Sequence, residues 1–146
     1  MERRKLGNGP EVGAIGFGCM GMSEFYGETD DAQSLETLAH AFDAGVTLFD
    51  TADIYGFGHN ERLVGRFIRD KRDRVVIATK AGIVRVQDDP ARRGVDNSPA
   101  YLTEHCEASL ARLGTDHVDL FYLHRIDPAT PLEESIGTLA RLREAG

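Results

Sequence analysis

The sequence predicts an α/β protein in which parallel strands alternate with helices. Short segments that are almost continuously apolar alternate four times with longer segments in which apolar residues recur at helical spacing. Strands that are apolar on both faces are typical of a parallel sheet whose faces are covered by helices. The chain has 146 residues, 41% of them hydrophobic, which suffices for one domain with its own core. We therefore predict a single domain, residues 1–146, without an internal linker.

The first elements of the chain are a hairpin and a glycine-rich strand. Residues 3–6 and 11–12 flank an Asn8-Gly9 pair, which is a strong hairpin signal. Residues 14–18 form the next predicted strand, and a loop follows to residue 28. The glycines at 16, 18 and 21 match the spacing of the dinucleotide-binding fingerprint, but no helix pattern opens after them. We therefore reject a Rossmann domain.

Cap residues and apolar spacing define the remaining elements. Thr29 or Asp30 can cap a helix in which Leu38 and Phe42 share one face and which ends at Gly45. Strands are assigned where β-branched and apolar residues run together without a break. The later elements, in order, are a strand over 46–52, a helix after residue 60, a strand over 74–80, a long polar loop over 83–97, a helix from Ser98-Pro99 to Gly114, a strand over 118–123, and a helix for which Thr130, Pro131 and Glu133 supply cap, first-turn proline and capping-box glutamate.

Four polar side chains follow the ends of the predicted strands. Asp50 lies in the second strand, Tyr55 in the loop after it, Lys80 at the end of the third strand and His124 at the end of the fourth. Each of them alone is more typical of a structural or solvated residue. Because parallel strands present their carboxyl ends at one edge of the sheet, we expect the four side chains to converge there.

These four residue types suit proton transfer to a carbonyl oxygen. A phenol is a weak acid at neutral pH, and a lysine ammonium beside it stabilises the phenolate and so eases proton release. Asp50 would hold Lys80 charged and in place, and His124 would orient a carbonyl oxygen through a hydrogen bond. The arrangement predicts a general acid directed at a carbonyl group.

Several motifs in the chain resemble signatures of the aldo-keto reductase family. Segments 4–7, 16–23 and 58–61 are similar to that family's opening hairpin, first strand and entry to the second helix. Taken in order, Asp50, Tyr55, Lys80 and His124 resemble its catalytic tetrad. The motifs that carry the likeness are Asp50-x-Ala52-x-x-Tyr55-Gly56, Ala78-Thr79-Lys80 and Tyr122-Leu123-His124-Arg125-Ile126-Asp127.

The resemblance implies a TIM-type (β/α)8 barrel that uses NADPH to reduce aldehydes or ketones to alcohols, with a small carbonyl compound as substrate. Tyr55 would be the proton donor, tuned by Lys80 and Asp50, and His124 would contact the substrate. Gly18, Cys19 and Met20 follow the first strand, and by position they and Asp50 would lie near the cofactor.

The chain length corresponds to about four of eight barrel units plus the N-terminal hairpin. An eight-unit barrel needs roughly 200 residues or more, and its phosphate site lies after strands seven and eight. A half-barrel has two open sheet edges, which favour self-association or pairing with a complementary C-terminal half. The alternative function is therefore that of a truncated, catalytically idle half-barrel acting as an assembly or interaction module.

Composition excludes other classes of function. The net charge of −7 argues against a nucleic-acid surface, because phosphate binding needs a basic face. We find no signal peptide or membrane-spanning segment and expect a cytoplasmic protein. Cys19 and Cys106 are far apart in the sequence, and we expect both to be reduced thiols.

A metal-dependent hydrolase is a further alternative, and it has little support. Its ligand types are present in Asp50, Asp53, His59, His124 and Asp127, but no close ligand pair occurs and Lys80 would compete for the same cleft. We therefore expect no metal site. Asp53 and Asp127 are interpreted as carboxylates that cap loops, and no function is assigned to the histidines at positions 40, 59, 105 and 117.

Overall fold

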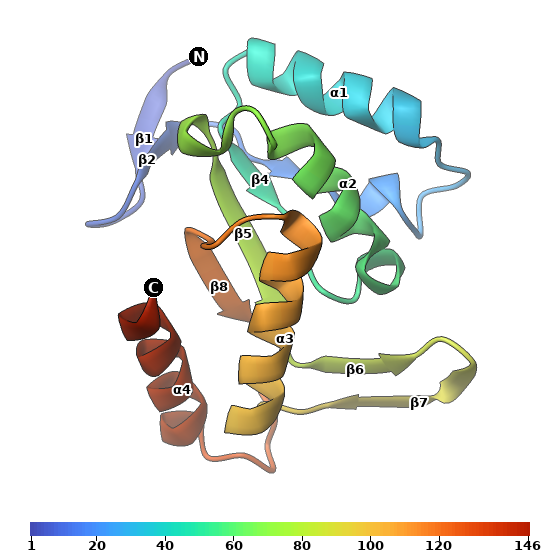
Figure 1. Cartoon of the computed structure of the whole chain (residues 1–146), viewed down its shortest axis with the longest axis vertical. Coiled ribbons are helices and arrows are strands. Elements are labelled where there is room, and N and C mark those ends of the chain that lie inside the picture. Colours follow the sequence, from blue (N-terminus) through green and yellow to red (C-terminus); the bar gives the residue numbers. More distant parts are fainter.

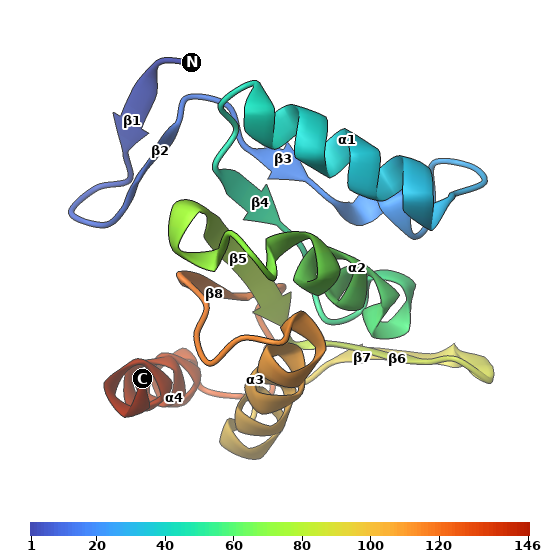
Figure 2. The same ribbon diagram turned by 45° about the horizontal axis from the view of Figure 1, so that its top comes forward.

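The computed structural model describes residues 1–146, apart from the side chains of residues 90 and 91. Its centre is a sheet of four parallel strands in the order β3-β4-β5-β8, and four helices follow around one side of it (Figures 1 and 2). The sheet is open and does not close into a barrel. The strands are β3 (Phe17–Gly18), β4 (Leu48–Asp50), β5 (Val76–Ala81) and β8 (Leu120–Leu123), and the helices are α1 (Asp31–Asp43), α2 (His59–Ile68), α3 (Pro99–Leu113) and α4 (Leu132–Ala145).

Most predicted elements form where local sequence signals place them. β1 (Arg3–Lys5) and β2 (Glu11–Gly13) form the expected antiparallel hairpin. The Asp30 side chain caps α1 by accepting from the Gln33 amide. Gly114 ends α3 in the left-handed conformation that glycine adopts without strain. The prediction of alternating parallel strand–helix units is confirmed.

Two predictions about local structure are wrong. Residues 83–97 are not a plain loop, because β6 (Ile83–Val86) and β7 (Asp89–Val95) form an antiparallel hairpin that projects from the body (Figure 1). Pro131 is the N-cap of α4 and not its first helical residue, and no side chain caps that helix end. The Thr130 hydroxyl instead donates to the Asp127 carboxylate at 2.8 Å, because this acceptor lies within the same turn.

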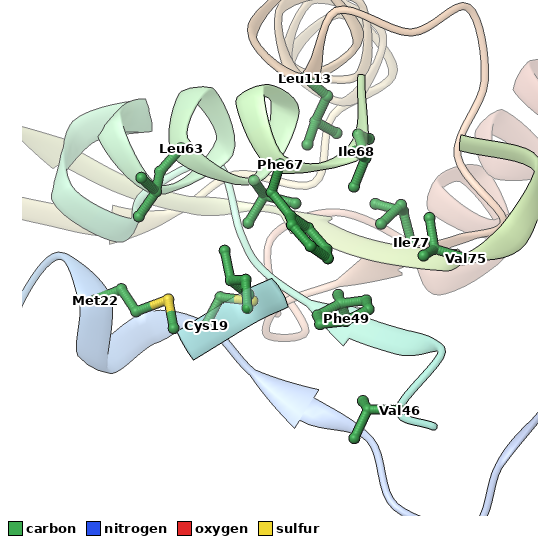
Figure 3. Close-up of a cluster of buried hydrophobic side chains, with 12 residues drawn as sticks. Cys19, Met22, Val46, Phe49, Leu63, Phe67, Ile68, Val75, Ile77 and Leu113 are labelled. Carbon is green, nitrogen blue, oxygen red and sulfur yellow. The ribbon is translucent and has the colours of Figure 1, made fainter. Parts of the chain in front are cut away.

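The hydrophobic core lies between the sheet and helices α1 and α2 (Figure 3). Phe49 at the centre of β4 is fully buried, and its ring contacts Phe67 of α2 edge-on at a centroid separation of 5.0 Å. Leu63 and Ile77 are buried beside them. This packing rigidly fixes the strands whose ends carry the candidate site. The cluster comprises Cys19, Met22, Leu38, Val46, Phe49, Leu63, Val64, Phe67, Ile68, Val75, Ile77 and Leu113.

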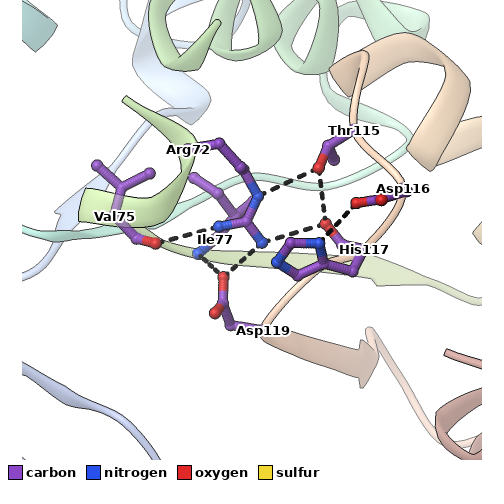
Figure 4. A network of polar contacts seen from close by, with 7 residues as sticks. All are labelled: Arg72, Val75, Ile77, Thr115, Asp116, His117 and Asp119. Carbon is purple, nitrogen blue, oxygen red and sulfur yellow. Dashed lines mark hydrogen bonds and ion pairs between the residues drawn. The ribbon is translucent and has the colours of Figure 1, made fainter. Parts of the chain in front are cut away.

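A polar network attaches β8 to β5 at the opposite end of the sheet from the candidate site (Figure 4). The guanidinium of Arg72 donates to the Asp119 carboxylate at 2.8 Å and to the carbonyl oxygens of Val75 and His117 at 3.1 Å each. The same Asp119 oxygen accepts the Ile77 amide at 2.8 Å. Since Asp119 immediately precedes β8, the network holds the register of that strand against β5.

We expect Arg72→Ala to lower the free energy of unfolding by about 2–3 kcal/mol, because it removes the guanidinium that donates to a mostly buried carboxylate and to two carbonyl oxygens. Denaturant unfolding of the purified chain measures this loss. Arg69→Ala, which removes an exposed arginine at the end of α2, is the matched control and should change stability by no more than about 0.5 kcal/mol. Equal losses in both variants would contradict the assigned role.

Candidate active site

Three of the four predicted site residues are in direct contact. The ammonium of Lys80 lies 2.6 Å from the Asp50 carboxylate and donates to the Thr51 carbonyl oxygen at 2.6 Å. The same ammonium lies 3.5 Å from the Tyr55 hydroxyl and 5.1 Å from the centre of its ring. Asp50 ends β4, Lys80 lies near the end of β5, and Tyr55 begins the short 3₁₀ helix Tyr55–Gly58 that follows β4. Adjacent parallel strands therefore bring a carboxylate, an ammonium and a phenol together.

His124 completes the group from the neighbouring strand. It directly follows β8, its amide donates to the Ala81 carbonyl oxygen at 2.8 Å, and its ring meets the Tyr55 ring edge-on at 5.8 Å. Burial, and next the positive charge of Lys80, lower the pKa of His124 below its ordinary value. The imidazole is therefore neutral at pH 7, and a neutral ring retains one nitrogen that donates and one that accepts.

The lowered pKa of His124 makes stability depend on pH. The unfolded chain binds a proton at this histidine below about pH 6.5 more readily than the folded chain does, so the folded state loses stability as the pH falls through that value. We expect denaturant unfolding at pH 7.5 and pH 5.5 to show this loss, and His124→Gln to reduce it. His117→Gln, at an exposed histidine, is the control, and an unchanged pH dependence in His124→Gln would contradict the assignment.

Two fully buried residues at the start of α2 hold the residues next to Asp50 and Lys80. Asn60 accepts the Thr51 hydroxyl at 2.7 Å, and Glu61 accepts the Thr79 hydroxyl at 2.6 Å. Arg112 of α3 donates to the second oxygen of Glu61 at 2.6 Å and balances its charge. The motif at residues 58–61 predicted only a helix entry, whereas its side chains brace the site.

The structure corrects the interpretation of Asp53 as a carboxylate that caps its loop. Asp53 does not cap its loop through the side chain, because one carboxylate oxygen lies 2.7 Å from Nδ1 of His105 in α3. The Asp53 side chain is 2% exposed, and a buried carboxylate takes a cationic or hydrogen-bonding partner where one is within reach. Its other oxygen and Nδ1 of His124 are buried without a hydrogen-bond partner among the described residues. Asp127 does cap its loop, by accepting the Ala129 amide at 2.9 Å.

Besides Asp50, three residues at the end of β3 are expected near a cofactor, and they differ in what they present. Gly18 is paired with Asp50 across β3 and β4, and a β-carbon built on it would meet no atom within 4 Å. Met20 is half-buried. The Cys19 side chain is fully buried in the core, and this burial raises the pKa of its thiol to about 12. Cys19 can therefore reach a ligand at this edge only through its backbone.

The described residues form neither a metal-binding cluster nor a membrane-spanning helix. Among the described residues, no group of three or more His, Cys, Asp or Glu side chains has the geometry to hold a metal ion. In that same part of the chain, no helix combines the length and apolar character needed to cross a membrane. Cys19 is buried, Cys106 is half-buried, and both are free thiols.

Comparison with known proteins identifies the family. Residues 14–146 match the model of the Aldo/keto reductase family. The chain belongs to this family. It is 40% identical over 145 residues to an NADP(+) aldo-keto reductase of Schizosaccharomyces pombe, yakc, and 41% identical over 150 residues to a probable aldo-keto reductase of Glycine max. These matches span 98% and 97% of this chain but only 42% and 41% of the relatives.

Solved aldo-keto reductases share the fold. The chain superimposes on the holo form of aldo-keto reductase AKR11C1 from Bacillus halodurans with a TM-score of 0.89 at 33% identity, covering all of this chain and 47% of that one. It also matches the glycerol dehydrogenase AKR11B4 from Gluconobacter oxydans with a TM-score of 0.85 at 32% identity, over 99% of this chain and 45% of that one. The chain thus has the strand–helix units of the TIM-type aldo-keto reductase barrel and spans about half the length of these structures.

Proposed function

We propose that this chain carries the proton-donating part of an NADPH-dependent reductase that converts aldehydes or ketones to alcohols. The observation that carries the proposal is the contact of one ammonium, that of Lys80, with both the Asp50 carboxylate and the Tyr55 hydroxyl, beside the neutral ring of His124. Membership of the aldo/keto reductase family supports this reaction.

Each residue of the tetrad has a distinct task in the proposed reaction. Reduced nicotinamide, when bound, supplies a hydride to the carbonyl carbon. Tyr55 donates its hydroxyl proton to the carbonyl oxygen, so that the alcohol leaves and a phenolate remains until solvent reprotonates it. The ammonium of Lys80 stabilises that phenolate, and Asp50 keeps the ammonium in place. His124 orients the carbonyl oxygen with its ring N–H.

The residues at the carboxyl edge of the sheet suit the nicotinamide ring, which is flat and partly apolar. The open space beside Gly18 lies next to Asp50, and the Asp50 side chain remains 39% exposed although it binds Lys80. A carboxamide N–H donates readily to such a half-exposed carboxylate. We propose that Gly18, Met20, the Cys19 backbone and Asp50 lie along the nicotinamide.

The test is NADPH oxidation by the purified chain with a reactive aromatic aldehyde, followed through the absorbance of the reduced cofactor. Turnover that depends on both the aldehyde and the chain would support the proposal. Titration of NADPH fluorescence with the chain separates binding from chemistry. If the folded chain neither binds NADPH nor reduces the aldehyde, the proposal is contradicted for this chain on its own.

The second candidate is a catalytically idle half-barrel that acts as an assembly module, and the open sheet edge favours it. Tyr122 on β8 is 44% exposed and Ile136 on α4 is 50% exposed. A cleft of about 750 Å³ opens between α3, the start of β8 and α4. Self-association and pairing with a complementary C-terminal half both remain predictions. Sedimentation of the chain alone and of the chain co-expressed with such a half distinguishes them.

A further inference from the structure

One arginine outside the tetrad follows β5 and contacts the loops that follow the two preceding strands of the sheet, β3 and β4. Arg85 lies in β6, directly after β5, and its Nη1 is 2.9 and 3.0 Å from the two carboxylate oxygens of Glu24 in the loop after β3. The same nitrogen lies 3.5 Å from the carbonyl oxygen of Ile54, the residue before Tyr55. Both members of the ion pair are largely buried, with side-chain exposures of 18% for Arg85 and 14% for Glu24.

The guanidinium of Arg85 also contacts two aromatic rings from those loops. Its central carbon is 4.6 Å from the ring centre of Phe57 and 5.7 Å from that of Phe25. These two phenylalanines are the non-glycine residues with positive φ among the residues that the structure describes, at 52° for Phe57 and 73° for Phe25. A bulky side chain is disfavoured in that conformation, so contacts in the surroundings must hold it.

The turn after Tyr55 is the strained element that matters for the site. Gly56 and Phe57 are both left-handed, with φ of 55° and 52°, and they directly follow the proposed proton donor. Phe57 as a whole residue is 38% exposed, so burial alone does little to hold this turn. Its flat face instead meets the guanidinium of Arg85, a contact that a planar cation makes well.

We propose that Arg85 is a positioning residue that clasps hairpin β6–β7 to the loops after β3 and β4 and thereby holds the turn that carries Tyr55. The Glu24 carboxylate orients the guanidinium, and the guanidinium plane supports Phe57. A cleft of about 210 Å³ lies beside this contact, lined by Phe57 and by hairpin residues that include Arg85, Val86 and Gln87. The catalytic consequence rests on the proposed function, whereas the clasp itself does not.

Hydrogen exchange of the purified chain tests the clasp without any need for activity. The informative amides are those of Glu24, Tyr55 and Phe57, which donate to Met20, Ala52 and Ile54 respectively. We expect Arg85→Met to raise exchange about tenfold or more at all three, because the lost hydrogen bonds to a charged group each contribute measurably to local opening. Arg3→Met, which breaks the exposed Arg3–Glu11 pair of the β1–β2 hairpin, is the matched control and should leave all three unchanged.

The variant Arg85→Lys separates the effect of the positive charge from the effect of the flat guanidinium group. A lysine retains the ion pair with Glu24 but lacks the plane that meets Phe57, so we expect near-normal exchange at Glu24 and raised exchange at Tyr55 and Phe57. Restoration of all three amides by lysine would overturn the role of the guanidinium plane. Faster exchange in Arg85→Met that is confined to β6–β7 would overturn the clasp altogether.

Kinetics decide the catalytic consequence. With the chain active, we expect Arg85→Met to lower kcat for aldehyde reduction about tenfold or more and to weaken NADPH binding by less than that, because the variant acts directly on the turn that carries the proton donor and reaches Met20 only through the Glu24 amide. An unchanged kcat would overturn the positioning role. Absence of turnover in the wild-type chain would contradict the proposed function, and the exchange data would still decide the clasp.

Discussion

Replacement of Tyr55 by phenylalanine is expected to lower the rate of carbonyl reduction by about 10²–10⁴-fold, the usual contribution of a positioned general acid. The variant keeps the ring, which is only 9% exposed and contacts His124 edge-on. It removes the hydroxyl that the Lys80 ammonium approaches at 3.5 Å. The measurement is kcat/KM for an aromatic aldehyde with NADPH in excess.

Two controls make the Tyr55 result specific. The free energy of unfolding of Tyr55→Phe should stay within about 1 kcal/mol of the wild type, because the hydroxyl makes one long contact. Tyr26→Phe removes a phenol from a residue that is 75% exposed and should keep full activity. Retention of activity by Tyr55→Phe would assign the proton donor to another group.

Replacement of Lys80 by methionine should produce the second large loss, again about 10²–10⁴-fold in kcat. The change removes the cation that faces the Tyr55 hydroxyl and the partner of the Asp50 carboxylate. Because Lys80 also donates to the Thr51 carbonyl oxygen, we expect stability to fall by about 1–3 kcal/mol as well. Activity must therefore be measured well below the melting temperature of the variant.

Two further variants help to separate the loss of kcat in Lys80→Met from its loss of stability. Lys5→Met removes an exposed lysine of β1 and should change neither activity nor stability. Asp50→Asn leaves the ammonium in place but weakens its anchor, so we expect a smaller loss of kcat than for Lys80→Met. A larger loss in Asp50→Asn than in Lys80→Met would mean that the carboxylate, and not the ammonium, acts on the substrate.

Much of the fold follows from local patterns that the sequence carries openly. The apolar run around Phe49 predicts a buried strand, and the caps Asp30 and Ser98 begin helices α1 and α3 as expected. The convergence of Asp50, Tyr55, Lys80 and His124 could be predicted because each of them ends a strand or follows one, and parallel strands share an edge. Hairpin β6–β7 was missed because it lies in a polar stretch, where the β-branched residues from Ile83 to Val86 are a weak signal.

The sequence by itself determined the order of the strand–helix units and the identity of the four residues at their ends. Only the tertiary structure decided which side chains contact the segments around them: Asn60 and Glu61 from α2, His105 from α3 and Arg85 from the hairpin. The physical reason is the separation in sequence between the residues that interact. Strand and helix signals arise between residues a few positions apart, whereas these hydrogen bonds and ion pairs join residues up to 61 positions apart, which only packing brings within reach.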